Sequence, residues 1–101
     1  MLKYFTLILF VAGIIACASK SDSNASSTPD GMAIYKQYCI LCHGGNGKLG
    51  LNGSKDITVS LLSEAERVVL ITNGKNTMTP FGGILSPEQI KAVAAYTMTL
   101  K

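Results

Sequence analysis

The segment "CILCH", residues 39–43, constrains this chain more than any other feature. Two cysteines stand three residues apart, and the only histidine of the chain follows the second cysteine at once. On a helix these positions share one face, so two thiols and an imidazole would converge. Such a cluster can serve as a metal site, as a redox dithiol or as the attachment point of a larger group.

The part of the chain that can fold is small, and it needs more than its own core to be stable. The chain has 101 residues and a formal charge of +3, and residues 30–101 form the predicted domain. Domains of this size often depend on a metal, disulfides or a cofactor. A disulfide between Cys39 and Cys42 would close a very short loop and would stabilise little.

Residues 1–16 are predicted to be a signal peptide. A lysine near the start precedes an apolar run, residues 4–16, which is shorter than the roughly 20 residues that span a bilayer. The alternative interpretation is an uncleaved membrane anchor. A signal peptide predicts an exported protein.

Cys17 is the predicted lipidation site. The stretch "IIAC", residues 14–17, resembles the bacterial lipobox, in which the cysteine is lipidated and becomes the mature N-terminus. The competing interpretation is ordinary cleavage at "ACA", residues 16–18. A lone cysteine in an exported protein otherwise lacks a role. Residues 17–29 then comprise the lipidation site and a flexible linker that is rich in Ser and has no bulky apolar residue. We therefore expect a lipid-anchored domain on the periplasmic face of a bacterial membrane or at the cell surface.

Three helices are predicted in the domain, and no strand pattern is convincing, so the fold class is all-α. The first runs from residue 30 or 31 to Cys42, the second from about residue 63 to Asn73, and the third starts at Pro87. Their predicted N-caps are Asp30, Ser63 and Ser86, the last two with capping-box partners Glu66 and Gln89. On the third helix, Ile90, Val93, Ala94 and Thr97 share one face. Residues 44–58 are rich in Gly and Asn and predict an irregular loop.

Two of the three interpretations of residues 39–43 meet difficulties. Structural zinc needs four N or S ligands, and the domain offers no further Cys or His. A thioredoxin-like dithiol follows a strand and opens a helix, whereas this pair closes a predicted helix.

The third interpretation is covalent haem, because C-x-x-C-H is the c-type attachment signature. Cys39 and Cys42 would form thioethers with the haem, and His43 would bind the iron on the proximal side. One such large apolar ring would also fill the interior of an undersized domain.

The far side of the iron needs a second ligand, and Met78 is the predicted one. Met32 lies too close to the attachment site, and a packing role is expected for Met98 on the last helix. Met78 lies in the loop "NTMTPFGG", which is long enough to cross the far face.

Taken together, these segments resemble a small mono-haem bacterial class I cytochrome c over residues 30–101. The resemblance rests on "YCILCHG", on "ITNGKNTMTPFGG" and on "LSPEQIKAVAAYTMTL". It implies a small cytochrome c-type fold with three main helices and long loops wrapped around one covalent haem c. It also implies that Tyr96 packs near Gly31 and Tyr35, where the glycine lets two helices cross closely.

The sequence departs from the family pattern in two ways. The family commonly has a proline after the haem motif whose carbonyl accepts the proximal imidazole's other proton, and here no proline precedes Pro80. A carbonyl within Leu51–Gly53 is expected to replace it. Arg67 and Lys55 are candidates for holding the haem propionates, although a solvated charge is the commoner role for each.

A haem with His and Met ligands has no open position, which predicts electron transfer rather than an enzyme. The alternatives are a haem-bearing subunit of a larger respiratory complex, or a five-coordinate enzyme or gas sensor if Met78 is not a ligand.

The expected partners are redox proteins, with the membrane reached through the lipid anchor. The domain carries seven Lys and Arg against five Asp and Glu, which gives no strongly basic face and no sign of nucleic-acid binding.

Overall fold

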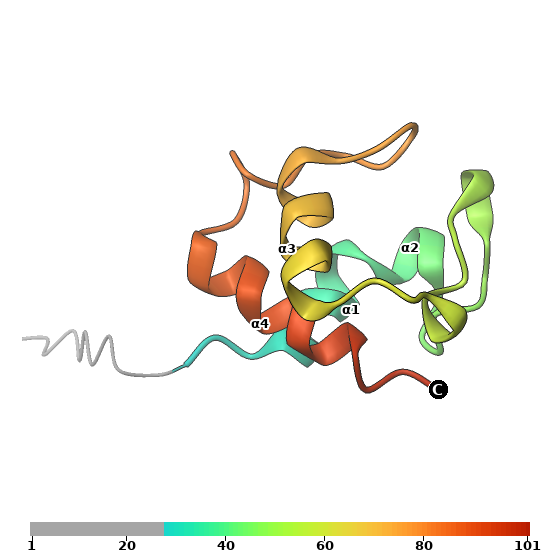
Figure 1. Ribbon diagram of the computed structural model, residues 1–101, viewed down its shortest axis with the longest axis horizontal. Coiled ribbons are helices and arrows are strands. Elements are labelled where there is room, and N and C mark those ends of the chain that lie inside the picture. Colours follow the sequence, from blue (N-terminus) through green and yellow to red (C-terminus); the bar gives the residue numbers. More distant parts are fainter. Residues whose placement is uncertain (1–27) are drawn as a thin grey trace, which may run out of the picture.

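The computed structural model describes residues 28–101. The signal peptide, Cys17 and most of the linker lie outside these residues, so their assignments stay predictions. The helices of the described part are α1 (Gly31–Tyr38), α2 (Ile40–His43), α3 (Glu64–Asn73) and α4 (Pro87–Thr97), with two short 3-10 helices, η1 (Leu51–Gly53) and η2 (Ile57–Val59) (Figure 1). Between residues 28 and 101, no helix is both long and apolar enough to cross a membrane.

The first predicted helix is kinked at Cys39. It begins as expected, since the Asp30 carboxylate accepts from the N–H groups of Met32 and Ala33 at 3.0 and 3.2 Å. At Cys39 the backbone has φ −113°, so α1 ends at Tyr38 and α2 follows it. The prediction of one unbroken helix to Cys42 is therefore wrong at this residue, where neither Gly nor Pro signals a break.

The two later helices begin as their sequences predict. Ser63 Oγ accepts from the Glu66 N–H at 3.1 Å, and the Glu66 carboxylate accepts from the Ser63 N–H at 2.7 Å. Ser86 and Gln89 make the same reciprocal pair at 3.1 and 2.8 Å. Capping boxes satisfy N–H groups that a helix start leaves without partners, which fixes where α3 and α4 begin.

Helix α1 crosses α4 closely at Gly31. A Cβ atom built on Gly31 would lie 2.7 Å from the Ala92 carbonyl carbon and 3.1 Å from Tyr96 Cβ. The rings of Tyr35 and Tyr96 pack beside this crossing, with centroids 5.2 Å apart and planes tilted by 54°. The contact expected from the family resemblance, Tyr96 near Gly31 and Tyr35, is confirmed.

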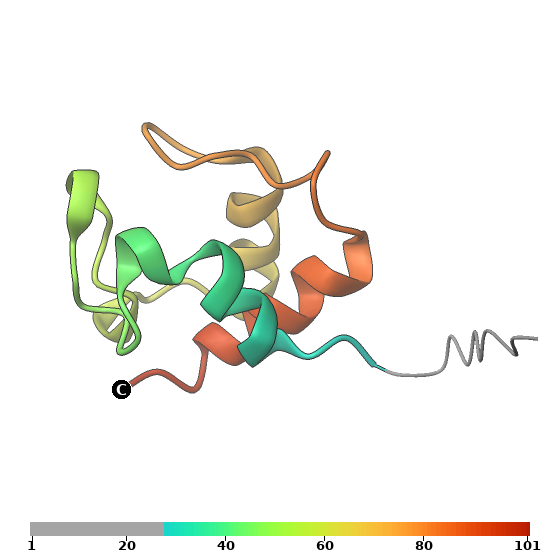
Figure 2. The same ribbon diagram turned by 180° about the vertical axis from the view of Figure 1, so that it is seen from behind.

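Helix α4 is the centre of the packing, because α1 and α3 both lie against it (Figures 1 and 2). Its predicted apolar face is confirmed, since Ile90, Val93, Ala94 and Thr97 are all buried. Loop 44–58 lies beside α2, at the side of the domain away from the start of α4, and loop 74–85 crosses the top of the domain before it descends to that start (Figures 1 and 2). The helices thus pack together around α4, and the two loops form the rest of the domain.

Candidate cofactor site

Two adjoining cavities lie between these loops and the helices. The inner cavity, of about 400 Å³, reaches Arg67 and Thr97, and the outer cavity, of about 630 Å³, reaches the loop of residues 73–79. Ligand sites in proteins commonly measure about 300–1,000 Å³. The two cavities are continuous, because they share the lining residues Cys39, His43, Lys55, Leu62, Leu70 and Met78.

Cys39 and Cys42 both line the outer cavity as free, partly buried thiols. Burial raises the pKa of Cys39 to about 11. Redox dithiols have thiols whose pKa is lowered by their surroundings, so this environment disfavours that interpretation. Among residues 28–101, no group of three or more His, Cys, Asp and Glu side chains is arranged to hold a metal ion.

The His43 ring is oriented by a main-chain carbonyl. Its Nδ1 lies 3.1 Å from the carbonyl oxygen of Lys55, and because a carbonyl only accepts, Nδ1 must donate. This leaves the Nε2 lone pair free to bind a metal.

The expectation that Leu51–Gly53 supplies this carbonyl is wrong. That segment folds into η1, in which the Leu51 carbonyl accepts from the N–H and the hydroxyl of Ser54 at 3.0 and 2.6 Å. The chain then extends from Ser54, and Lys55 becomes the residue whose carbonyl reaches the imidazole.

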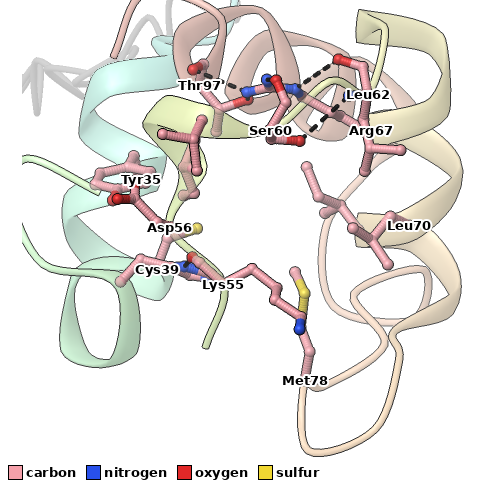
Figure 3. A pocket seen from close by; sticks show the side chains of 14 residues that line it. Tyr35, Cys39, Lys55, Asp56, Ser60, Leu62, Arg67, Leu70, Met78 and Thr97 are labelled. Atoms are coloured by element: carbon pink, nitrogen blue, oxygen red, sulfur yellow. Dashed lines mark hydrogen bonds between the residues drawn. The ribbon is translucent and has the colours of Figure 1, made fainter. Parts of the chain in front are cut away.

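Met78 lines both cavities, and its side chain points into them from the loop that follows α3 (Figure 3). The loop turns back tightly, with the Met78 N–H donating to the Lys75 carbonyl at 3.0 Å. The Phe81 N–H then donates to the Ile71 carbonyl at 2.9 Å, which returns the chain to α3. The methionine is therefore presented by a loop that is fixed at both ends.

The two other methionines of the domain do not belong to the lining of either cavity. Met32 is 44% exposed on α1. Met98 is 42% exposed, so the packing role expected for it is wrong.

Most of the inner cavity is apolar, formed by Tyr35, Ile57, Val59, Leu62, Leu70 and Ile71. The Tyr35 hydroxyl turns away from this lining and donates to the Gly44 carbonyl at 2.6 Å, and burial raises its pKa to about 12. Val59 and Leu62 are 71% and 38% exposed. A large flat apolar group bound here would cover them, so the lining fits a porphyrin.

Arg67 is 7% exposed and lines the inner cavity, so the expectation that it is a solvated surface charge is wrong. The sequence did carry a signal for this position. Arg67 stands three and four residues before Leu70 and Ile71, which places it on the inward face of α3. Lys55 lines both cavities and is exposed, and its side chain crosses toward Met78 (Figure 3).

Comparison with known proteins places the chain in a family. Residues 26–96 match the family described as "Cytochrome C oxidase, cbb3-type, subunit III". The chain is 36% identical to a cytochrome c6 of Nostoc sp. strain PCC 7120, over 97% of this chain and 93% of that protein. It is 40% identical to the cbb3-type cytochrome c oxidase subunit FixP of Azorhizobium caulinodans, over 82% of this chain and 30% of the larger protein.

Solved structures agree with these sequence similarities. The c-type cytochrome KustC0563 superposes with a TM-score of 0.63 at 30% identity, covering 71% of this chain and 98% of the other. Cytochrome c6 of the diatom Phaeodactylum tricornutum gives a TM-score of 0.55 at 32% identity, covering 67% of this chain and 86% of the other. The all-α cytochrome fold expected from the sequence is confirmed, and the chain belongs to the small electron-transfer c-type cytochromes, which carry one covalent haem c.

Proposed function

We propose that Cys39 and Cys42 hold the haem through thioethers and that His43 and Met78 bind its iron from opposite sides. One observation carries this proposal: all four side chains, from two segments 35 residues apart, line the outer cavity. The donor chemistry also fits. The thiols are unpaired, the imidazole has Nε2 free, and a thioether is a known axial ligand of haem iron.

This ligand set supports a carrier of single electrons. A six-coordinate iron offers no position for a substrate, and a methionine ligand raises the reduction potential. The chain's own part is to hold geometry: the Lys55 carbonyl fixes the imidazole, the 74–81 loop fixes Met78, and the apolar lining keeps water away. Small changes in geometry between the two oxidation states favour rapid electron exchange.

Substituting Met78 tests the ligand assignment. We expect Met78→Ala to abolish the methionine–iron charge-transfer band of the oxidised protein and to let the reduced protein bind carbon monoxide rapidly. Met98→Ala is the matched control, because Met98 is exposed and outside the cavity lining, and it should keep the band. A wild-type protein without the band and with rapid carbon monoxide binding would instead favour a five-coordinate enzyme or gas sensor.

We further propose that the domain is exported and tethered through a lipid on Cys17, and that it exchanges electrons with redox proteins at a bacterial membrane or cell surface. The sequence at the end of the predicted signal peptide supports this, since "IIAC", residues 14–17, is followed by a Ser-rich linker. Intact mass of the exported protein tests it, because a lipid and a haem each add a defined mass. A mature protein beginning at Ser19 would show ordinary cleavage instead.

A second candidate is a haem-bearing subunit of a larger respiratory complex. The match to a cbb3-type oxidase subunit family and the similarity to FixP favour it. Transient redox encounters are small and weaken with salt. Co-purification with membrane subunits at high salt would therefore support the subunit, and a domain released alone would support the carrier.

A further inference from the structure

Arg67 is a buried cation whose hydrogen-bond partners are all neutral. Its Nε donates to the Leu62 carbonyl at 3.1 Å, and its Nη1 donates to the carbonyl and the hydroxyl of Thr97 at 3.0 and 3.1 Å. Its Nη2 donates to the Ser60 carbonyl at 3.3 Å. These acceptors satisfy N–H groups but bring no negative charge.

The two acidic side chains that line the cavities, Asp56 and Glu66, form hydrogen bonds to groups other than Arg67. Asp56 Oδ1 accepts from the N–H and the hydroxyl of Thr58 at 2.9 and 2.6 Å, and Glu66 caps α3 through Ser63. A charge that is removed from water without an opposite charge is costly. An arginine buried in this way therefore favours a nearby anion, and no carboxylate of residues 28–101 hydrogen-bonds to it.

The guanidinium also keeps an unused donor. The four hydrogen bonds leave one N–H, on Nη2, without an acceptor among residues 28–101. Arg67 lies at the end of the inner cavity with Thr97, Ser60 and Leu62, and Met78 and Lys55 lie at the opposite end (Figure 3). A carboxylate inside the cavity could receive this N–H together with the charge.

We propose that Arg67 binds a propionate carboxylate of the covalent haem and acts as a fixed internal cation that raises the reduction potential of the iron. Positive charge near the iron disfavours the ferric state, and burial keeps solvent from screening it. A carboxylate that is held by a guanidinium also loses much of its own opposing effect. The inference rests on the covalent haem, and it does not depend on Met78 as the second ligand.

The test is the midpoint potential of the holoprotein in a charge series at this one position. We expect Arg67→Gln to lower the equilibrium constant for one-electron reduction about tenfold, which is about 59 mV. Arg67→Lys keeps the charge and should stay within about threefold of the wild type, which is about 28 mV on the same scale. Lys91→Gln is the matched control: it removes an exposed cation of α4, whose effect on the iron solvent and salt should largely screen.

A purely structural role gives a different pattern. Arg67 also joins α3 to the end of α4, so Arg67→Gln will lower stability in either case. Thr97→Val separates the two roles, because it removes an acceptor but keeps the charge. It should lower stability and leave the potential unchanged. A stable Arg67→Gln holoprotein with the wild-type potential would overturn the proposal.

If Arg67→Gln does not accumulate with haem, Arg67→His allows the charge to be switched within one folded protein. A histidine is charged at about pH 5 and largely neutral at about pH 8. We expect its midpoint to fall more than that of the wild type over this interval. Equal pH dependence of the two proteins would count against Arg67 as the internal cation.

Discussion

The hydroxyl of Thr77 donates to the carbonyl of Asn52 at 2.9 Å, across 25 residues of sequence. This bond joins the loop that presents Met78 to η1, at the rim of the outer cavity. The Asn52 backbone is in a left-handed conformation, with φ 54°, and its carbonyl faces the loop that carries Thr77. The two loops that line the outer cavity are thus held to each other as well as to the helices.

Thr77→Val tests whether this bond holds Met78 in place. Losing one hydrogen bond costs about 0.5–1.5 kcal/mol, so the loop should open several times more often. We expect added imidazole to bind the oxidised iron several-fold faster, because it competes with Met78 for the open position. Thr79→Val is the control, since the Thr79 hydroxyl is at the same rim and makes no hydrogen bond within residues 28–101. Equal binding rates in all three proteins would show that the bond is dispensable.

Gly31→Ala should destabilise the domain by about 1–3 kcal/mol. The added methyl group would meet the Ala92 backbone at the crossing of α1 and α4, and backbone cannot yield as a flexible side chain does. Chemical unfolding of the holoprotein measures the loss. Gly83→Ala serves as the control, because nothing lies within 4 Å of its Cβ, and it should change stability by less than about 0.5 kcal/mol.

Gly74→Ala should damage the Met78 loop. Gly74 has φ 68°, and a Cβ there would lie 2.5 Å from the Met78 carbonyl oxygen and 2.8 Å from the Pro80 nitrogen. We expect a weaker methionine–iron band together with a loss of stability. Gly53→Ala also has a positive φ, 76°, but no neighbour within 4 Å, so it measures the cost of a positive φ without such a contact, about 1–2 kcal/mol. A Gly74→Ala variant no worse than Gly53→Ala would contradict the importance of this contact.

Tyr35 predicts a defined alkaline sensitivity. Its pKa is raised to about 12, so it contributes stability that is complete below about pH 10 and is lost as the pH rises through about 12. Tyr35→Phe should cost about 1 kcal/mol near neutrality, through the lost hydrogen bond to Gly44, and should show a flatter loss of stability above pH 10. Unfolding free energies measured across this pH range give the comparison. Tyr38→Phe should follow the wild-type curve, and an unchanged alkaline slope in Tyr35→Phe would contradict the assignment.

The regular part of the fold was predictable because its signals are local. The capping boxes at Ser63 and Ser86 and the apolar face of α4 depend on residues within a few positions of one another. The crossing at Gly31 came from the resemblance to a family, whereas Met78 was chosen among the three methionines of the domain because it stands in a long loop. The kink at Cys39 had no local signal, because no helix-breaking residue stands there.

The parts of the site that sequence missed are decided by distant contacts. The acceptor of the His43 ring depends on how η1 uses up its own carbonyls, which only the folded loop reveals. Arg67 is buried because Thr97 and the irregular segment 60–62 supply acceptors from elsewhere in the chain. Its charge led to the expectation of a solvated arginine, and its spacing from Leu70 and Ile71 on α3 is the signal that would have corrected this expectation.

The bond between His43 and Lys55 is made by main chain on one side, so a substitution at position 55 replaces the side chain and leaves the acceptor where it was. The Lys55 side chain meanwhile is exposed and lines both cavities. The side-chain charge and the main-chain acceptor at position 55 are therefore separable. A substitution can change the charge that lines the cavities, while the His43 imidazole keeps its tautomer. Substitutions at position 55 can therefore change the charge that a redox partner meets there without removing the hydrogen bond to His43.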